Sequence, residues 1–102
     1  MIIYNVTIKV DHSITEEWLH WMKTEHIPDL MKTGLFIDHR LCRLLEQDEA
    51  DGRTYTVQYF CDSLEHYQNY INEHAQKMRD KGVKKFGSKF IAFRTVMEVE
   101  PA

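Results

Sequence analysis

His26 is the residue of this chain with the clearest capacity for chemistry. It stands in the segment Glu25-His26-Ile27-Pro28, where Pro28 lacks a backbone N–H and clashes with the preceding helical turn. A break in a helix there leaves backbone groups free to meet a ligand or water. An imidazole beside such a break is suited to act as an acid, a base or a hydrogen-bond donor. The alternative is structural: His26 binds the freed backbone groups and fixes the break.

A second set of candidates falls on one face of the predicted strands. His39 shares that face with Tyr4 and Tyr59, because strand residues alternate between the two faces of a sheet. With Trp21 from the first helix, these side chains form an apolar cleft with a few polar groups, which is typical of a small-ligand site. We therefore predict His26 and His39 as catalytic candidates, and Tyr4, Trp21 and Tyr59 as ligand-binding residues. The alternative is that the aromatic residues are simply core.

The six histidines do not predict a metal site. His20 and His26 are six residues apart, and His66 and His74 are eight apart, whereas a helical zinc pair needs a spacing of four. The chain has two cysteines and no cysteine-rich motif. Its four glycines form no phosphate-binding loop. We predict neither a metal nor a cofactor.

Charge and composition exclude several classes of protein. The net charge is −3, and nucleic-acid-binding domains usually carry a basic excess. No apolar run approaches the roughly 18 residues that a membrane span needs. The first residues run directly into a strand pattern and do not resemble an export signal. These observations predict a cytoplasmic protein that binds neither nucleic acid nor a membrane.

The elements that position these residues follow from hydrophobic periodicity. Alternation predicts strands and a spacing of three to four residues predicts helices. The predicted strands cover Ile2–Val10, Phe36–Glu46, Arg53–Cys61 and Phe90–Val99. The predicted helices cover Ile14 to about Thr33, with the break near Pro28, and Leu64 to about Met78, with Gly82 and Gly87 at the exit. Ser13 with Glu16 and Asp62 with Glu65 have the spacing of capping boxes.

This order, β-α-β-β-α-β, predicts an α+β fold of the ferredoxin-like kind. It has a four-stranded antiparallel sheet in the spatial order 4-1-3-2, with two helices on one face. Residues 1–102 are expected to form a single domain. Cys42 and Cys61 fall on opposite sheet faces, which predicts free thiols. The face without helices mixes polar residues with Ile3, Leu44 and Phe60, and such a face suits a dimer interface.

Three segments carry a resemblance to known proteins: residues 21–28, Tyr59-Phe60 and residues 90–95. With the broken first helix, they make the chain similar to the dimeric α/β-barrel superfamily. It resembles more closely an uncharacterised bacterial family within it, a domain of unknown function. The resemblance implies a homodimer in which two sheets face each other as a barrel. It implies no particular reaction, because fold alone does not settle function.

The sequence leaves three functions open. The first is binding of a small organic ligand in the cleft between helices and sheet. The second is a cofactor-free monooxygenase or isomerase of the dimeric α/β-barrel type, with His26 or His39 transferring a proton. The third is a non-catalytic interaction module, in which Trp18, Trp21 and Met22 fill the cleft. A cavity with polar groups in its wall separates the first two from the third.

Overall fold

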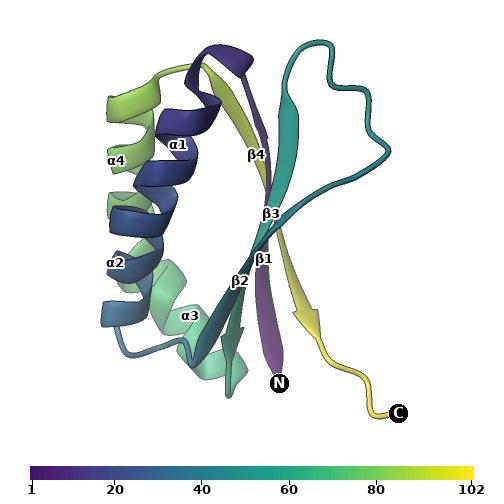
Figure 1. Ribbon diagram of the computed structural model, residues 1–102. Helices are drawn as coiled ribbons and strands as arrows, with labels where there is room; N and C mark the ends of the chain where they lie inside the picture. Colours follow the sequence, from purple (N-terminus) through teal and green to yellow (C-terminus); the bar gives the residue numbers. More distant parts are fainter.

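The fold is a four-stranded antiparallel sheet with all helices on one face. A computed structural model describes all residues, 1–102. The strands are β1 (Ile2–Val10), β2 (Asp38–Arg43), β3 (Arg53–Cys61) and β4 (Phe90–Glu98). Their spatial order is β2-β3-β1-β4. The helices form the second layer (Figure 1) and are α1 (Thr15–Trp21), α2 (Ile27–Lys32), α3 (Leu64–Glu73) and α4 (Ala75–Phe86). The predicted α+β ferredoxin-like fold and strand order are confirmed.

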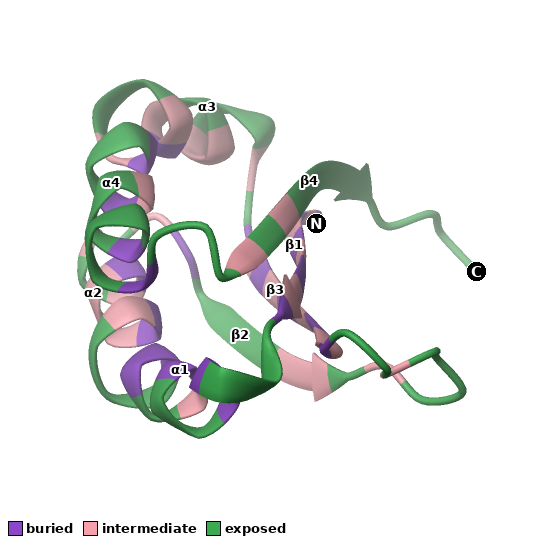
Figure 2. Cartoon of the chain, turned by 90° about the horizontal axis from the view of Figure 1, so that it is seen from above, coloured by how far each residue is buried: buried purple, intermediate pink, exposed green.

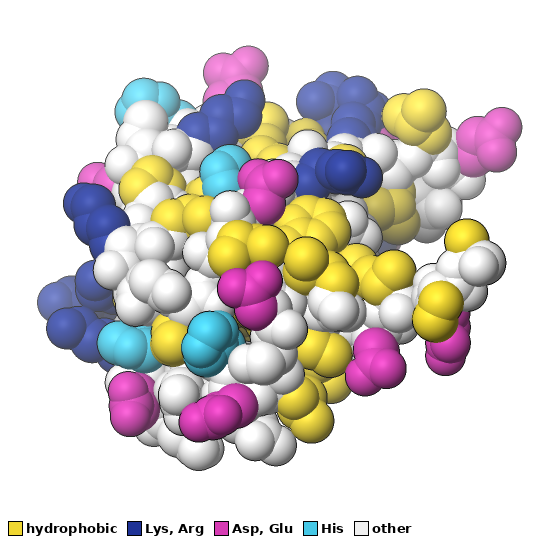
Figure 3. Space-filling model, turned by 90° about the horizontal axis from the view of Figure 1, so that it is seen from below, with side chains coloured by type: hydrophobic (Ala, Val, Ile, Leu, Met, Phe, Trp, Pro, Cys, Tyr) yellow, Lys and Arg dark blue, Asp and Glu magenta, His cyan; other side chains and the backbone are white.

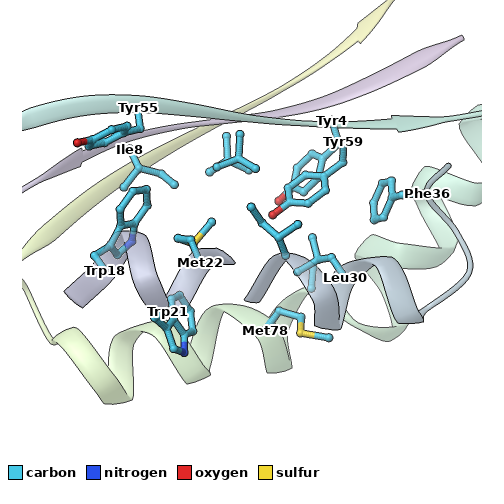
Figure 4. Close-up of a cluster of buried hydrophobic side chains, with 14 of the residues drawn as sticks. Tyr4, Ile8, Trp18, Trp21, Met22, Leu30, Phe36, Tyr55, Tyr59 and Met78 are labelled. Atoms are coloured by element: carbon cyan, nitrogen blue, oxygen red, sulfur yellow. The ribbon is translucent and has the colours of Figure 1, made fainter. Parts of the chain in front are cut away.

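The core lies between the sheet and the helices. Alternate residues of β1, from Ile2 to Val10, are buried, and their neighbours are half-buried. Tyr4 stands opposite Tyr59 of β3, so the buried rows of β1 and β3 share one face. Val96 of β4, also opposite Tyr4, is exposed. The inner sides of the helices are buried and their outer sides exposed (Figure 2). Tyr4 and Tyr59 project from the sheet toward Met22 and Leu30 of the helical layer (Figure 4).

The first helical segment is broken as predicted, and the break is a π-helical turn. It covers Met22–His26, between α1 and α2. The N–H of Ile27 donates to the carbonyl of Met22, five residues back, as a π turn requires. Pro28 then stands in the first turn of α2, where a helix does not need its N–H. The wide turn therefore lets the chain pass the proline and continue as a helix.

The second helical segment differs from the prediction. It consists of α3 and α4, which meet at His74, and Gly82 lies inside α4 instead of at its exit. Only Gly87, with φ of 61°, ends the helix. Gly82 is buried inside the helix, and a Cβ there would lie at an ordinary contact distance of 3.6 Å from the Trp21 ring. The position therefore does not require glycine, and the helix continues through it.

Two predicted capping boxes and both ends of one predicted strand are also wrong. Asp11 accepts the Ser13 N–H at the first cap, and Ser63, not Asp62, accepts the His66 N–H at the second. Strand β2 covers only Asp38–Arg43 of the predicted 36–46, because Phe36 turns into the core instead of joining the ladder.

The cysteines are free, as predicted. Cys42 pairs with Thr56 across β2 and β3, whereas Cys61 pairs with Ile2 and is buried. Their positions on opposite sheet faces prevent a disulfide within the chain.

No helix of the structure is long and apolar enough to cross a membrane.

Candidate functional site

A cavity of about 50 Å³ lies between the helical layer and the β1–β4 side of the sheet. Most of its wall is apolar. A water molecule needs only about 10–15 Å³ of such volume, so the cavity has room for a few waters or part of a small organic molecule. Strand residues in its wall are Tyr4, Val6, Ile8, Tyr59, Phe90, Ala92 and Arg94. Helical residues in its wall are Trp18, Trp21, Met22, His26, Leu30, Tyr70, Met78, Arg79, Gly82 and Phe86.

His26, at the end of the π turn, lines this cavity and carries an unpaired ring nitrogen. Its Nδ1 is buried and has no hydrogen-bond partner. The ring stacks on Trp21 instead of binding backbone groups, with centroids 4.7 Å apart and an angle of 26° between the planes. Burial lowers the pKa of His26 to about 4; nearby Asp29 opposes the shift, and Lys81 and Arg94 add to it. At neutral pH the imidazole is therefore uncharged and able to donate or accept a hydrogen bond.

Three tyrosines converge on the same space from different elements. Tyr4 lies 5.9 Å from Tyr59 and 5.5 Å from Tyr70, measured between ring centroids. The Tyr59 hydroxyl is buried and has no hydrogen-bond partner. Burial raises the pKa of Tyr59 and of Tyr70, with further contributions from neighbouring tyrosines. Both therefore stay protonated, and the Tyr59 hydroxyl is a free donor.

Arg79 of α4 and Arg94 of β4 add positive charge to the cavity wall. The Nε of half-buried Arg79 has no partner, and its Nη2 lies 3.5 Å from the Tyr4 hydroxyl. Arg94 pairs with Val6 on the helix-covered face and is itself exposed. The cavity thus combines a deep apolar part with a cationic rim.

The structure brings four of the five predicted site residues together. Tyr4, Trp21, His26 and Tyr59 all line the cavity. His39 has the predicted strand parity, since it stands opposite Tyr59, but it is exposed on the edge strand β2. It lines a separate open groove with Lys23 and Arg40. The edge position separates His39 from the cavity, which lies toward β4.

Sequence reasoning missed the two arginines of the cavity. The basic segment around Arg79 looks like an ordinary complement to the dipole at a helix end. Strand alternation from Phe90 through Ala92 to Arg94 does place Arg94 on the helix-covered face. Strand parity could therefore have identified Arg94 as a residue of this face from the sequence.

No group of three or more His, Cys, Asp or Glu side chains is arranged to hold a metal ion.

The fold resembles several solved structures over almost their whole length. One is a Deinococcus radiodurans protein assigned as an antibiotic biosynthesis monooxygenase (TM-score 0.72, 13% identity, 100% of this chain and 95% of that chain). Another is an ethyl tert-butyl ether D family protein from Bacillus halodurans (TM-score 0.67, 17% identity, 98% and 100% covered). A third is a dimeric ferredoxin-like protein from an uncultured marine organism (TM-score 0.69, 15% identity, 100% and 97% covered). At these identities the likeness establishes the fold alone.

A comparison with curated proteins found no significant match. The chain does match a protein-family model, described as a domain of unknown function, over residues 1–100. The resemblance stated from the sequence is thereby confirmed. This chain belongs to the family DUF4286, within the ferredoxin-like fold.

Proposed function

We propose that this protein binds a small organic molecule in the cavity between its helices and its sheet. One observation carries the proposal: His26 Nδ1, the Tyr59 hydroxyl and Arg79 Nε are buried, lack partners and belong to the wall of one cavity. An unpaired buried polar group costs about 1–3 kcal/mol, so three at one place are unfavourable unless something occupies the cavity. The only other such atom, Asn5 Oδ1, belongs to the opposite sheet face.

Each of the predicted contacts has a distinct role in this proposal. Trp21 forms an apolar wall, and Tyr4 and Tyr59 offer hydroxyl groups from the sheet. His26 supplies a neutral hydrogen-bonding nitrogen. His39 is kept as a second candidate for proton transfer, through the open groove that it lines with Arg40.

The experiment is to identify what the native protein carries. Protein purified without denaturation is unfolded, and the released small molecules are identified by mass spectrometry. Ala92→Leu places a larger side chain in the cavity wall and should remove the molecule, whereas Lys84→Leu, on the exposed part of α4, should retain it. The proposal fails if wild type releases nothing in stoichiometric amount and no member of a small-molecule library raises its melting temperature.

A cofactor-free monooxygenase or isomerase is the second candidate. It is favoured by a neutral imidazole in a mostly apolar cavity, where a proton acceptor is shielded from water. The low pKa of His26 makes it a weak base at neutral pH, so binding ranks first. Incubating the released molecule with protein and oxygen, and measuring its mass, distinguishes the two functions. A mass change with wild type but not with His26→Phe would establish catalysis.

The interaction-module hypothesis is the least supported. It expects Trp18, Trp21 and Met22 to fill the cleft. All three line its wall, and about 50 Å³ remains between them and the sheet.

We also propose that the chain acts as a single domain, forms a homodimer in the cytoplasm and binds no nucleic acid. The support for the dimer is the sheet face without helices, where Phe93 is 68% exposed and Ile91 59%. Phe93 stands opposite Thr7, and on the same face Met97, which is 38% exposed, stands opposite the predicted interface residue Ile3. Ile3 in turn stands opposite Phe60. At the lower end of the molecule, viewed in Figure 3, hydrophobic side chains likewise reach the surface between charged ones. Two similar structures are of dimeric ferredoxin-like proteins. The net charge of −3 supports the absence of nucleic acid.

A further inference from the structure

The cavity wall holds two arginines and no acidic residue. The protein as a whole is acidic, with sixteen Asp and Glu against thirteen Lys and Arg, so this is a local reversal of charge. Two carboxylates of the helical layer are paired with lysines. Asp29 lies 3.5 Å from Lys81, and Glu17 lies 3.6 Å from Lys85. Neither Arg79 nor Arg94 forms an ion pair.

Of the two arginines, Arg79 gives the stronger evidence for a bound anion. A guanidinium stays charged at all physiological pH values and has five N–H donors. The Nε of Arg79 is buried without a partner. The only hydrogen bond of the side chain is donated by Nη2 to the Tyr4 hydroxyl and is long at 3.5 Å. Burying such a group without an anion is unfavourable. Its planar donors match a carboxylate in the two-pronged geometry that arginine prefers.

Arg94 acts on the same space from β4. Burial raises the pKa of Tyr70 first, and Tyr4 adds to it, while Arg79 and Arg94 both lower it. Arg94 also lowers the pKa of His26, after the larger effect of burial. Two cations carried by different elements therefore lie close to the same cavity residues. Their fields add where an anion would sit.

From this arrangement we infer that the ligand is a small organic anion, an aromatic carboxylate with one ring. Arg79 binds the carboxylate, Arg94 attracts it from the rim, and the ring packs among Trp21, Phe86 and Tyr4. A cavity that holds benzene has a volume of about 150 Å³. At about 50 Å³ this cavity takes only part of one ring unless side chains of its wall move apart, and a fused-ring body would need a larger rearrangement. The inference rests on the proposed function and specifies its ligand class.

The test uses pairs of probes that differ in charge and hardly in shape. These are benzoate with benzamide, phenylacetate with phenylacetamide, and salicylate with salicylamide. Binding to the full chain is measured by NMR titration, for wild type, Arg79→Met, Arg79→Lys, Arg94→Met and the control Lys84→Met. Met keeps the length and apolar stem of Arg, and the exposed Arg94 offers a second variant that leaves the core intact. Circular dichroism verifies that each variant is folded.

The expected result is that a carboxylate binds at least about tenfold more tightly than its amide, as a charge-assisted hydrogen bond implies. Arg79→Met should remove this preference, Arg79→Lys should keep part of it, and Lys84→Met should not change it. Equal binding of both members of each pair overturns the anion inference alone and leaves small-molecule binding intact. So does a preference that survives both Arg79→Met and Arg94→Met. Binding by no probe at millimolar concentration overturns the anion inference. It overturns the proposed function as well if wild type releases no molecule and no library member raises its melting temperature.

Discussion

The imidazole of His26 lies against the indole of Trp21, five residues earlier, with ring centroids 4.7 Å apart. In a continuous α-helix, residues five apart point about 140° away from each other. The π turn at Met22–His26 inserts one residue, so His26 takes the place that residue 25 would otherwise hold. The same turn that accommodates Pro28 therefore stacks the histidine on the tryptophan and places it in the cavity wall.

Two substitutions of His26 should separate its packing from its polarity. His26→Phe keeps a ring on Trp21 and removes the unpaired Nδ1, so the free energy of unfolding should fall by less than about 0.5 kcal/mol or should rise. His26→Ala removes the ring and should cost about 2–3 kcal/mol through the void that it leaves. Urea denaturation of the ligand-free proteins measures both. Equal losses in the two variants would mean that the imidazole nitrogens themselves stabilise the fold.

The stability of the protein should decrease in mild acid because of His26. Its pKa is lowered to about 4 in the folded state, chiefly by burial, whereas an unfolded histidine has about 6.5. The unfolded state therefore binds the proton first. The contribution of neutral His26 to the free energy of unfolding is complete above pH 6.5 and is lost as the pH falls toward 4. The loss is at most about 3 kcal/mol.

Denaturant titrations between about pH 7 and pH 4.5 measure this loss. His26→Phe should lose much less stability than wild type over that range. His20→Phe, at an exposed position, is the matched control and should follow wild type. Parallel curves for His26→Phe and wild type would show that other groups cause the acid sensitivity.

The two glycines of the α4 region should respond to alanine with opposite signs. Gly82→Ala should raise stability by about 0.5–1 kcal/mol, because alanine favours a helix interior. Its Cβ has ordinary contacts, 3.6 Å from Trp21 and 3.7 Å from Phe90. Gly87→Ala should lower stability by about 1 kcal/mol, because φ of 61° is strained for a residue with a Cβ. Thermal unfolding compares the variants; a destabilised Gly82→Ala would mean that the contact with Trp21 is tighter than these distances indicate.

A charge on the open sheet face should dissociate the proposed dimer. Phe60→Glu or Phe93→Glu would bury an unpaired carboxylate in the interface, which costs several kcal/mol. Sedimentation at micromolar concentration should then show a 12.2 kDa species with its helical circular dichroism intact. Val83→Glu, on the exposed side of α4, is the control and should remain dimeric. A wild-type protein that sediments as 12.2 kDa would refute the dimer.

Most of the fold could be predicted from local patterns. Alternation in Ile2–Val10 and Arg53–Cys61 identified both central strands with their observed ends, because the period of two directly reports a sheet with one buried face. Strand β2 was less predictable, because it is a short edge strand with little buried area. The caps failed for a related reason: Asp11 and Ser63 compete with equally good neighbours, and local geometry decides between them.

The candidate site, like the fold, could be predicted only in part from the sequence. Residue types and strand parity were sufficient to select Tyr4 and Tyr59, since an aromatic side chain on a buried strand face packs into the core. His26 was selected by the helix break before Pro28. Parity could not separate His39 from them, because it defines a face and not a distance along the sheet. The position of the cavity toward β4, away from β2, depends on how the helices cross the strands.

The sequence by itself determined the element order, the buried strand faces, the break before Pro28 and the free thiols, because each depends on neighbours a few residues apart. Only the tertiary structure decided that Arg79 and Arg94 share a cavity with His26. These residues come from α4, β4 and the π turn, and no local period relates them. Their meeting depends on the docking of two helical segments onto one sheet, which is a property of the packed molecule as a whole.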